Sequence, residues 1–389
     1  MSIPDIFKIL DQIADQIAKI ERQREEFNKV LKSIKDIIDL RVLPKNLTQY
    51  LWDNKLFKKI EPSSLKGLKI AGIDGGLISK SLHGIDIVIT RAVAAIFTYG
   101  KEKPYVEYYP ANYQFPNIRT SFDPFTNTES ELFANLERIN AEIETALGVL
   151  DKEPDIILLD GAILPQLRER AGLNTTISNR YNDIVKKYEQ LFDECINGNT
   201  YLVGCIKDSR SFQFLKIFIQ LFPILINKYQ ELRQVLESDY NYRTLLSQNR
   251  DSDFLFRFLD VGERSLIFDY HDFAGQLPKV FSIFNEYWVD KIKIFYLKAV
   301  EYDIPSRIEI LVPESDKNKI ISICDQMASI IYPLSSHHSE FSVPSVLIEA
   351  DAKAKMSEYD MDIVYNSLLD KLGKNSPLLY KFRRDRRPF

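Results

Sequence analysis

The sequence has few cysteines, little net charge and no long hydrophobic run. Its three cysteines, Cys195, Cys205 and Cys324, lie far apart and none belongs to a CxxC pair. This spacing argues against a disulfide framework or a zinc site and favours a reducing compartment. No apolar segment approaches the ~20 residues that span a bilayer, and the N-terminus lacks the apolar core of a signal peptide. We therefore expect a cytoplasmic protein that does not contact a membrane.

The charge balance excludes a strong overall attraction for nucleic acid. The 389 residues carry 51 basic and 55 acidic side chains, a net charge of −4, so nucleic-acid binding would depend on local basic patches. With 45% hydrophobic and 27% charged residues, the composition is that of a globular protein and excludes a wholly disordered or collagen-like chain. At roughly 100–200 residues per domain, the length predicts two or three structural units.

The first forty residues have the periodicity of one long helix. Spacings of four and three alternate along an apolar seam, in which Arg24 occupies one position. The seam comprises Ile6, Leu10, Ile13, Ile17, Ile20, Phe27, Leu31, Ile34 and Ile38. The pattern predicts a helix that either pairs with another chain or packs on its own domain. The mixed, polar segment 44–66 that follows is interpreted as a connector.

Beyond the connector, apolar strands alternate with helical patterns. Apolar and β-branched runs predict an early meander whose first strand lies in the middle of a sheet. The predicted strands are 68–73, 85–99, 105–109, 155–159, 201–206, 292–300 and 307–311. The predicted helices are 130–150, 179–196, 215–236 with a break or kink near Pro223, 316–330 and 361–372. This order predicts an α/β core.

Two Asp-Gly pairs follow apolar strands of this core. Asp74 opens the segment Asp74-Gly75-Gly76, and Asp160 precedes Gly161. Functional groups of open α/β sheets lie beyond the carboxyl ends of strands, and a glycine there permits a sharp turn. Two such carboxylates with a helical glutamate nearby would suit two Mg²⁺ or Mn²⁺ ions, the arrangement that supports phosphodiester hydrolysis. Alternatively, each pair only opens a turn.

The order and spacing of these motifs resemble the NurA nuclease family. The resemblance rests on KIAGIDGG (69–76), DIILLDGAIL (155–164), YLVGCIKDSRS (201–211), FYLKAVEYDIPSRIEI (295–310) and VPSVLIEADAKAK (343–355). It implies an α/β fold of the RNase H-like (Piwi-like) type, a mixed sheet flanked by helices, with a long N-terminal helical extension. The implied domains are an N-terminal helical region and connector at 1–64, the nuclease domain at 65–375 and a basic tail at 376–389.

The resemblance also implies the residues of a metal site. The family has an aspartate on the first strand, a glutamate on the helix before the next core strand and an aspartate at the end of that strand. Asp74 and Asp160 match the two aspartates. Glu142 and Glu144 are both candidates for the glutamate, and Glu142 is preferred because Arg138 lies one turn earlier in the helix.

A later family motif of the form Tyr-Pro-…-Leu-…-Ala-His corresponds to residues 343–351. Here Val343 occupies the tyrosine position and Asp351 the histidine position. Aspartate can replace histidine as a ligand of a hard metal, so Asp351 joins the predicted ligand set. Valine cannot replace the hydroxyl of tyrosine, which puts a phosphate contact at Val343 in doubt.

Other charged residues have both functional and structural interpretations. Lys207, after the strand 201–206, would hold the scissile phosphate or else be a solvated lysine at a strand end. Arg307 and Glu309 alternate on a late strand and are interpreted as structural or as supporting the metal site indirectly. His271 lies in an aromatic run that would approach DNA or form a partly buried loop. The basic segment 381–387 would contact phosphates or an acidic partner, or be solvated.

The sequence and the resemblance together predict a Mn²⁺- or Mg²⁺-dependent deoxyribonuclease. The family resemblance implies two metal ions and a ring-like homodimer docked on a HerA-type hexameric ATPase, in DNA repair or anti-phage defence. Two alternatives remain. GIDGG also resembles the first phosphate loop of actin-like ATPases and sugar kinases, although Leu77 follows where Ser or Thr is usual. A catalytically degenerate adaptor of the motor would agree with the replacements at Val343 and Asp351.

Overall fold

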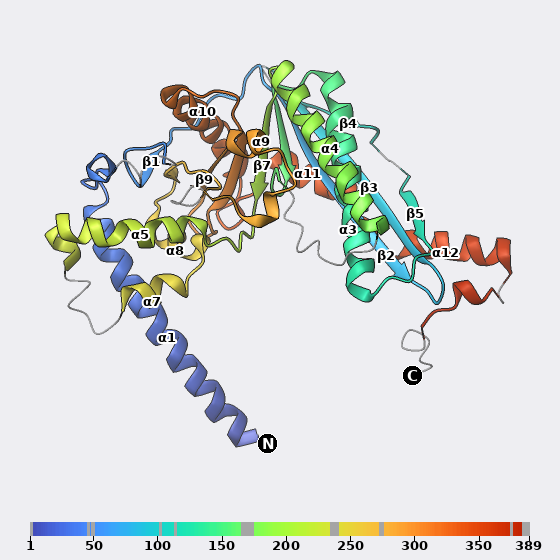
Figure 1. Cartoon of the computed structure of the whole chain (residues 1–389), viewed down its shortest axis with the longest axis horizontal. Coiled ribbons are helices and arrows are strands. Elements are labelled where there is room, and N and C mark those ends of the chain that lie inside the picture. Colours follow the sequence, from blue (N-terminus) through green and yellow to red (C-terminus); the bar gives the residue numbers. More distant parts are fainter. Residues whose placement is uncertain are drawn as a thin grey trace. The chain divides into compact units, whose positions relative to one another are not determined.

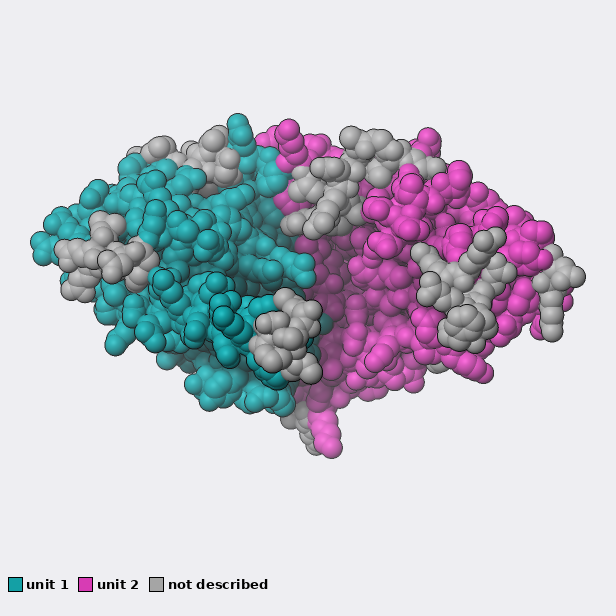
Figure 2. Space-filling view, turned by 90° about the horizontal axis from the view of Figure 1, so that it is seen from below, with its two compact units in different colours: residues 1–63, 206–278, 292–343 teal, residues 64–205, 279–291, 344–389 magenta. Residues whose placement is uncertain are grey.

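The computed structural model describes most of the chain and divides it into two compact units. The described residues are 3–44, 47, 51–100, 103–112, 115–164, 175–233, 241–271, 276–373 and 376–382. Figure 2 colours unit 1 (1–63, 206–278, 292–343) and unit 2 (64–205, 279–291, 344–389). The predicted domains 1–64, 65–375 and 376–389 have other boundaries than these two units, and they stay a prediction. None of the described helices is long and apolar enough to cross a membrane.

Unit 2 is built on a mixed sheet with the strand order β7-β6-β2-β3-β4 (Figure 1). The strands are β2 (Lys69–Ser81), β3 (Asp86–Thr98), β4 (Tyr105–Tyr109), β6 (Ile156–Asp160) and β7 (Tyr201–Ile206), and β5 (Asn117–Ser121) also pairs with β3. The pairs β2–β3 and β3–β4 are antiparallel, whereas β2–β6 and β6–β7 are parallel. A three-stranded meander followed by two parallel strands on the other side of its first strand is the RNase H-like arrangement. The predicted fold class and the central place of the first strand are confirmed.

Helices connect and cover this sheet. They are α3 (Asn127–Val149), α4 (Thr175–Asn197), α9 (Glu286–Lys291), α11 (Ser345–Ala354) and α12 (Glu358–Leu372). α3 starts at a capping box in which Thr126 accepts from the backbone of Glu129 while the Glu129 side chain accepts from that of Thr126. It buries Leu136 and Ile143, as the helical periodicity of 130–150 predicts. α11 packs on β2 and β3, and the sequence pattern did not predict it as a helix.

Unit 1 contains a second, antiparallel set of strands in the order β1-β8-β9-β10. These are β1 (Phe57–Lys59), β8 (Glu263–Ser265), β9 (Ile292–Lys298) and β10 (Ser306–Leu311). Its helices are α1 (Ile3–Ile34), α5 (Gln213–Lys228), α7 (Tyr242–Ser247), α8 (Asp251–Phe258) and α10 (Lys317–Ser335). α5 continues through Pro223 as a helix. The segment interpreted as a connector supplies β1 and the buried side chains of Leu51, Leu56 and Ile60, so it forms part of this core.

The two halves of α1 have different surroundings. In the C-terminal half, Phe27 and Leu31 are buried, and the Phe27 ring centroid lies 5.3 Å from that of Phe222 and 6.4 Å from that of Phe254. In the N-terminal half the seam residues remain 40–56% exposed: Ile6, Leu10, Ile13, Ile17 and Ile20. Figure 1 draws this half projecting from the other elements of unit 1. Packing on its own domain, one of the two predictions for the seam, therefore applies to the second half only.

We expect Leu31→Ala to lower the free energy of unfolding by about 2–5 kcal/mol, because it leaves a cavity in the core of unit 1. Ile13→Ala, on the same seam of the same helix, should change it by less than about 0.5 kcal/mol, since Ile13 is 45% exposed. Urea unfolding of the two variants and the wild type measures both effects. Equal losses in the two variants would contradict the division of α1 into a packed and an exposed half.

Candidate metal centre

Asp74 lies within β2 and not at its end. β2 pairs in parallel with β6 only from Ile70 to Ile73, opposite Ile156 to Leu159, and then continues along β3 as far as Ser81. The prediction that Asp74 opens a turn after a strand is therefore wrong. The next position of the parallel register brings Asp74 beside Asp160, the last residue of β6. The turn expected after Asp160 is present, since Gly161 has φ +139° and ends the strand.

Glu142 approaches these aspartates at a position where β2 has no side chain. Successive residues of a strand point to opposite faces, so Gly75 faces away from the side chain of Asp74. A Cβ at Gly75 would lie 2.6 Å from Oε1 and 2.7 Å from Cγ of Glu142 on α3, so only glycine leaves room for this carboxylate. Glu144 is half-exposed and forms an ion pair with Lys187 at 2.6 Å. The structure thus brings Glu142, and not Glu144, to Asp74.

Asp351 reaches Asp74 from the opposite face of the sheet. α11 lies so close to β2 that a Cβ at Gly72 would be 2.5 Å from the backbone C and O atoms of Val346, and one at Gly76 would be 2.5 Å from a backbone oxygen at the end of α11. Gly72, Asp74 and Gly76 share this face because side chains alternate along a strand. The negative charge of Asp351 lies near enough to Asp74 to raise the pKa of Asp74 further.

Burial and neighbouring negative charge raise the pKa of two of the four carboxyl groups. Burial first, and then the charge of Asp160, raises the pKa of Asp74 to about 7, although the Gly75 N–H donates to its Oδ1 at 2.7 Å. Burial also raises the pKa of Glu142 to about 8, with a smaller contribution from Asp74, while the paired guanidinium of Arg138 opposes the shift. These carboxyl groups are therefore stabilised by any cation placed among them.

The donor set fits a hard divalent cation. Four carboxylates, on β2, β6, α3 and α11, present only oxygen atoms, which Mg²⁺ and Mn²⁺ prefer. Among the described residues, no three of these groups have oxygens within 4.8 Å of one another. Mutual repulsion of the negative charges favours this separation between the carboxylate oxygens. A bound divalent cation would draw the oxygens toward itself. Asp74, Glu142, Asp160 and Asp351 are thus suitable ligands held on rigid elements.

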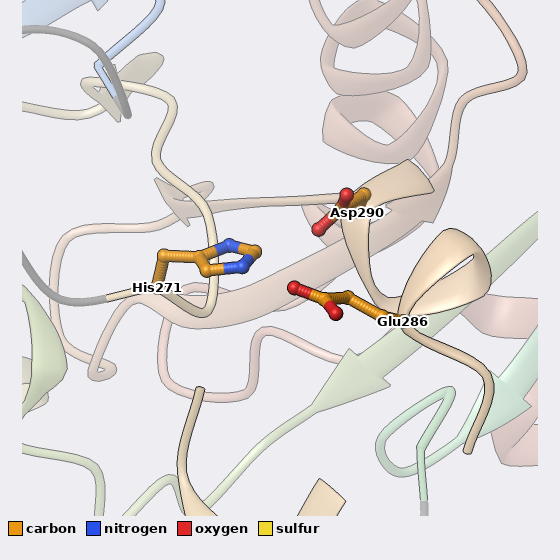
Figure 3. A group of neighbouring side chains, drawn as sticks. All are labelled: His271, Glu286 and Asp290. Atoms are coloured by element: carbon orange, nitrogen blue, oxygen red, sulfur yellow. The ribbon is translucent and has the colours of Figure 1, made fainter. Parts of the chain in front are cut away.

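A second set of potential ligands consists of His271, Glu286 and Asp290 (Figure 3). Glu286 and Asp290 lie one turn apart on α9 in unit 2, and both are exposed. His271 is buried, as one interpretation of its aromatic run expects, and belongs to unit 1. Because these side chains come from different units, they do not define a site within either one.

Lys207, Arg307 and Glu309 belong to unit 1. Lys207 directly follows β7, and its predicted contact with the scissile phosphate stays a prediction. Arg307 Nε donates to Glu309 at 2.9 Å on β10, and the hydroxyl of Tyr270 donates to the same carboxylate at 2.5 Å, so this buried group has the structural role that one interpretation assigned to it. Residues 383–389 of the basic tail lie outside the described residues.

Two features of the site were missed in the sequence. One is α11, which carries Asp351. The other is the role of the glycines near Asp74. They do not form a turn but leave room for α3 and α11 to approach β2. A signal for the second was present, since the apolar residues Leu77 and Ile78 follow the glycines and continue the strand.

Comparisons with known proteins relate the chain to one family. A family model described as the NurA domain matches residues 68–356. The solved NurA nuclease of Sulfolobus solfataricus is 16% identical over 96% of this chain and 99% of that chain, and its TM-score of 0.53 indicates a shared fold. Two other solved structures, one of NurA and one of NurA bound to dAMP and manganese, are 14% and 13% identical. They cover 97% and 95% of this chain and 100% and 99% of their own, with TM-scores of 0.40 and 0.39. No curated protein matches the chain.

We expect the metal-free protein to become less stable as pH rises from about 4 to about 8. A carboxyl group whose pKa is higher in the folded state stabilises the fold below its unfolded pKa, and this contribution is lost as pH rises through the folded values of about 7 and about 8. Urea unfolding in the presence of a chelator measures the slope. Asp74→Asn, which mimics the protonated acid, should reduce it, whereas Asp151→Asn at an exposed position should not. An unchanged slope in Asp74→Asn would contradict the assignment.

Proposed function

We propose, since the chain belongs to the NurA family, that it is a metal-dependent deoxyribonuclease that acts in the cytoplasm as an exonuclease, an endonuclease or both. The observation that carries the proposal is the convergence of four carboxylates on β2 of an RNase H-like sheet. They come from Asp74, Asp160, Glu142 and Asp351, which lie on four different elements of one compact unit. An oxygen-only set of this kind favours hydrolysis of a phosphodiester over redox or thiol chemistry.

The four carboxylates would hold one or two Mn²⁺ or Mg²⁺ ions. When bound, such ions activate a water and stabilise charge on the attacking and leaving oxygens of a phosphodiester. The contribution of the chain is to fix the ligands: Asp74 and Asp160 by the parallel register, Glu142 and Asp351 by helices packed on β2. The ion pair with Arg138 restricts the side chain of Glu142 further.

Asp351 takes the place of the family histidine in this proposal. Its position near Asp74, whose pKa the charge of Asp351 helps to raise, supports a role as a ligand. Val343, at the position of the family tyrosine, is buried and apolar, so it offers no hydroxyl to a phosphate. The site we propose thus has one more carboxylate and one fewer hydroxyl than the family pattern. The extra negative charge favours a divalent cation over binding of a nucleotide without metal.

We expect Asp74→Asn and Asp160→Asn each to lower the rate of DNA cleavage at least about 100-fold. Replacing a residue that only orients a metal ligand typically lowers metal affinity or activity about 10–100-fold. Asp74 and Asp160 would bind the ion directly, so the loss should be at least as large. Glu142→Gln and Glu144→Gln form a matched pair on one helix, and only Glu142→Gln should lose metal-dependent cleavage. The assay follows labelled linear DNA with Mn²⁺ and with a chelator. Full activity in Asp74→Asn, or loss in Glu144→Gln alone, would contradict the ligand assignment.

The same preparation tests the two alternative functions. Cleavage of linear but not circular DNA would identify an exonuclease, and cleavage of both an endonuclease. Binding of ATP without cleavage would support an ATP-binding protein of the actin-like or sugar-kinase type. Absence of both activities would support a degenerate adaptor. Circular dichroism of each variant establishes that lost activity does not result from unfolding.

We propose further that the protein is a homodimer that docks on a HerA-type hexameric ATPase, in DNA repair or anti-phage defence. A net charge of −4 gives little long-range attraction for DNA, so a device that delivers the substrate would help catalysis on long molecules. The exposed half of α1 supports self-association, because its apolar stripe has no cover among the described residues.

We expect the double variant Ile13→Glu/Ile17→Glu to convert a dimer into a monomer in light scattering at micromolar concentration. Charges on the apolar stripe would have to be buried in a paired helix, which is costly. Deletion of the whole N-terminal region to Pro44 is less informative, because it also removes Phe27 and Leu31 from the core of unit 1. A monomeric wild type would contradict the dimer. An unchanged dimeric mass in the double variant would remove α1 from the interface.

A further inference from the structure

Unit 2 contains a cavity at the end of β2, beyond the carboxylates. Its volume is about 390 Å³, within the roughly 300–1,000 Å³ typical of small-ligand sites. Three segments line it: the end of β2, the start of α3 and the segment after α12. The polar side chains that they offer are those of Ser79, Lys80, Ser81, Asn127, Ser130, Glu131 and Lys381. None of these residues belongs to the candidate metal centre.

Two of the lining residues bring positive charge to one aromatic ring. Nζ of Lys80 lies 4.5 Å and Nζ of Lys381 lies 5.2 Å from the centroid of the Tyr365 ring. Lys80 also pairs with Asp362 at 3.4 Å, but this carboxylate is 54% exposed and is therefore screened by water. Among the described residues, no carboxylate lies within 4.0 Å of Lys381 Nζ. An anion in the cavity would be attracted by both ammonium groups.

Other lining residues of the cavity supply hydroxyl groups. The Oγ atoms of Ser81 and Ser130 lie 3.0 Å apart, so one donates to the other and the pair retains a further donor. Ser79 shares the face of Ser81, because side chains two residues apart on a strand point the same way. Ammonium and hydroxyl donors that line one cavity are the chemistry that recognises a phosphate oxygen.

The segment that carries Lys381 is fixed by an apolar cluster of its own. This cluster joins the β2–β3 hairpin to α12 and to the segment after it, and consists of Leu82, Ile87, Ile89, Met361, Tyr365 and Leu379. Figure 1 shows α12 at this end of the hairpin. The backbone N–H of His83 donates to Tyr380 O at 2.8 Å, and the Tyr365 hydroxyl donates to Leu379 O at 3.0 Å. The Tyr365 ring and the backbone just before Lys381 are therefore held in place before any ligand binds.

We propose that this cavity binds a phosphate group of the nucleic-acid strand whose scissile bond lies at the carboxylates, a proposal that rests on the nuclease function proposed above. Two elements connect the sites. Lys80 follows Asp74 by six residues on β2, about 20 Å at ~3.3 Å per residue. Ser130 precedes Glu142 by twelve residues on α3, about 18 Å at ~1.5 Å per residue.

These two lengths agree, and they set the distance between the contacts along the substrate. A separation of about 20 Å spans about six phosphates of a B-form strand at ~3.4 Å per phosphate. The cavity would therefore hold the backbone several nucleotides from the bond that is cleaved. Because β2 and α3 are regular elements that pack on each other, the spacing would not change between substrates.

One lining residue opposes an anion, and it provides a control of opposite sign. Glu131, on the first turns of α3, is exposed at the rim of the cavity. Its carboxylate would repel a phosphate that the two lysines attract. Glu131→Gln should therefore strengthen binding at this place, whereas Lys80→Ala and Lys381→Ala should weaken it. A surface that merely attracts DNA through many charges would not depend on these three positions together.

The test measures binding of labelled single-stranded DNA to the full-length protein in a chelator, by fluorescence anisotropy. With an oligonucleotide of about 20 nucleotides, Lys80→Ala and Lys381→Ala should each weaken binding about 3–10-fold, and the slope of log affinity against log salt should fall by about 0.7. Lys381→Arg, which keeps the charge, should bind like the wild type. Lys186→Ala, at an exposed lysine of α4, should change affinity less than about twofold.

This experiment distinguishes an internal phosphate from a terminal one. It also tests the phosphate site separately from the nuclease function. Equal losses with 5′-phosphorylated and 5′-hydroxyl strands identify an internal phosphodiester, whereas a loss confined to the phosphorylated strand identifies a terminal phosphate. Wild-type affinity for the long strand in both lysine variants would overturn the site, even if the protein cleaves DNA. Weaker binding by the lysine variants of a protein that does not cleave DNA would retain the phosphate site and refute the nuclease function.

Discussion

The four acidic side chains of the candidate metal centre repel one another. The packing of strands and helices in unit 2 holds them together against this repulsion. The parallel register of β2 and β6 places Asp74 beside Asp160, and two helices press further carboxylates toward them from opposite faces. Both helices approach the strand where it lacks side chains, at Gly75 for α3 and at Gly72 for α11. The raised pKa values of Asp74 and Glu142 reflect the cost of this arrangement, first through burial of the carboxyl groups and then through neighbouring negative charge. Apolar burial elsewhere in the sheet and its helices must exceed that cost for the unit to fold.

Much of unit 2 is predictable from the sequence because its apolar periods are long and regular. The meander, the helix over 130–150 and the two parallel strands follow from these periods, and their order gives the RNase H-like class. Two errors have a common cause. The glycines after Asp74 and the polar composition of 44–66 are local signals of turns and connectors, but tertiary contacts decide otherwise in both places. Gly75 accommodates the side chain of Glu142, and β1 within 44–66 pairs with β8.

The candidate site is predictable only in part. Asp74 and Asp160 stand out because each follows an apolar run. The choice between Glu142 and Glu144 depends on the rotation of α3 about its axis relative to Gly75, and periodicity does not determine that angle to within one residue. Asp351 is found by resemblance to a motif, since residues 345–354 form a helix too short for a clear period. The proposed phosphate cavity has no signature in the sequence, because Lys80, Ser130 and Lys381 are far apart in the chain and are brought together by the packing of α3 and α12 on β2.

The two environments of α1 have a mechanical consequence. The helix has 32 residues and is therefore about 48 Å long at ~1.5 Å per residue. Its C-terminal half is embedded in the core of unit 1 through Phe27 and Leu31, and its N-terminal half projects from that core. An uninterrupted helix is stiff over this length, unlike a peptide tether. A partner bound to the projecting half could therefore rotate the whole helix, and this rotation would be transmitted directly to α5 and α8, against which Phe27 packs.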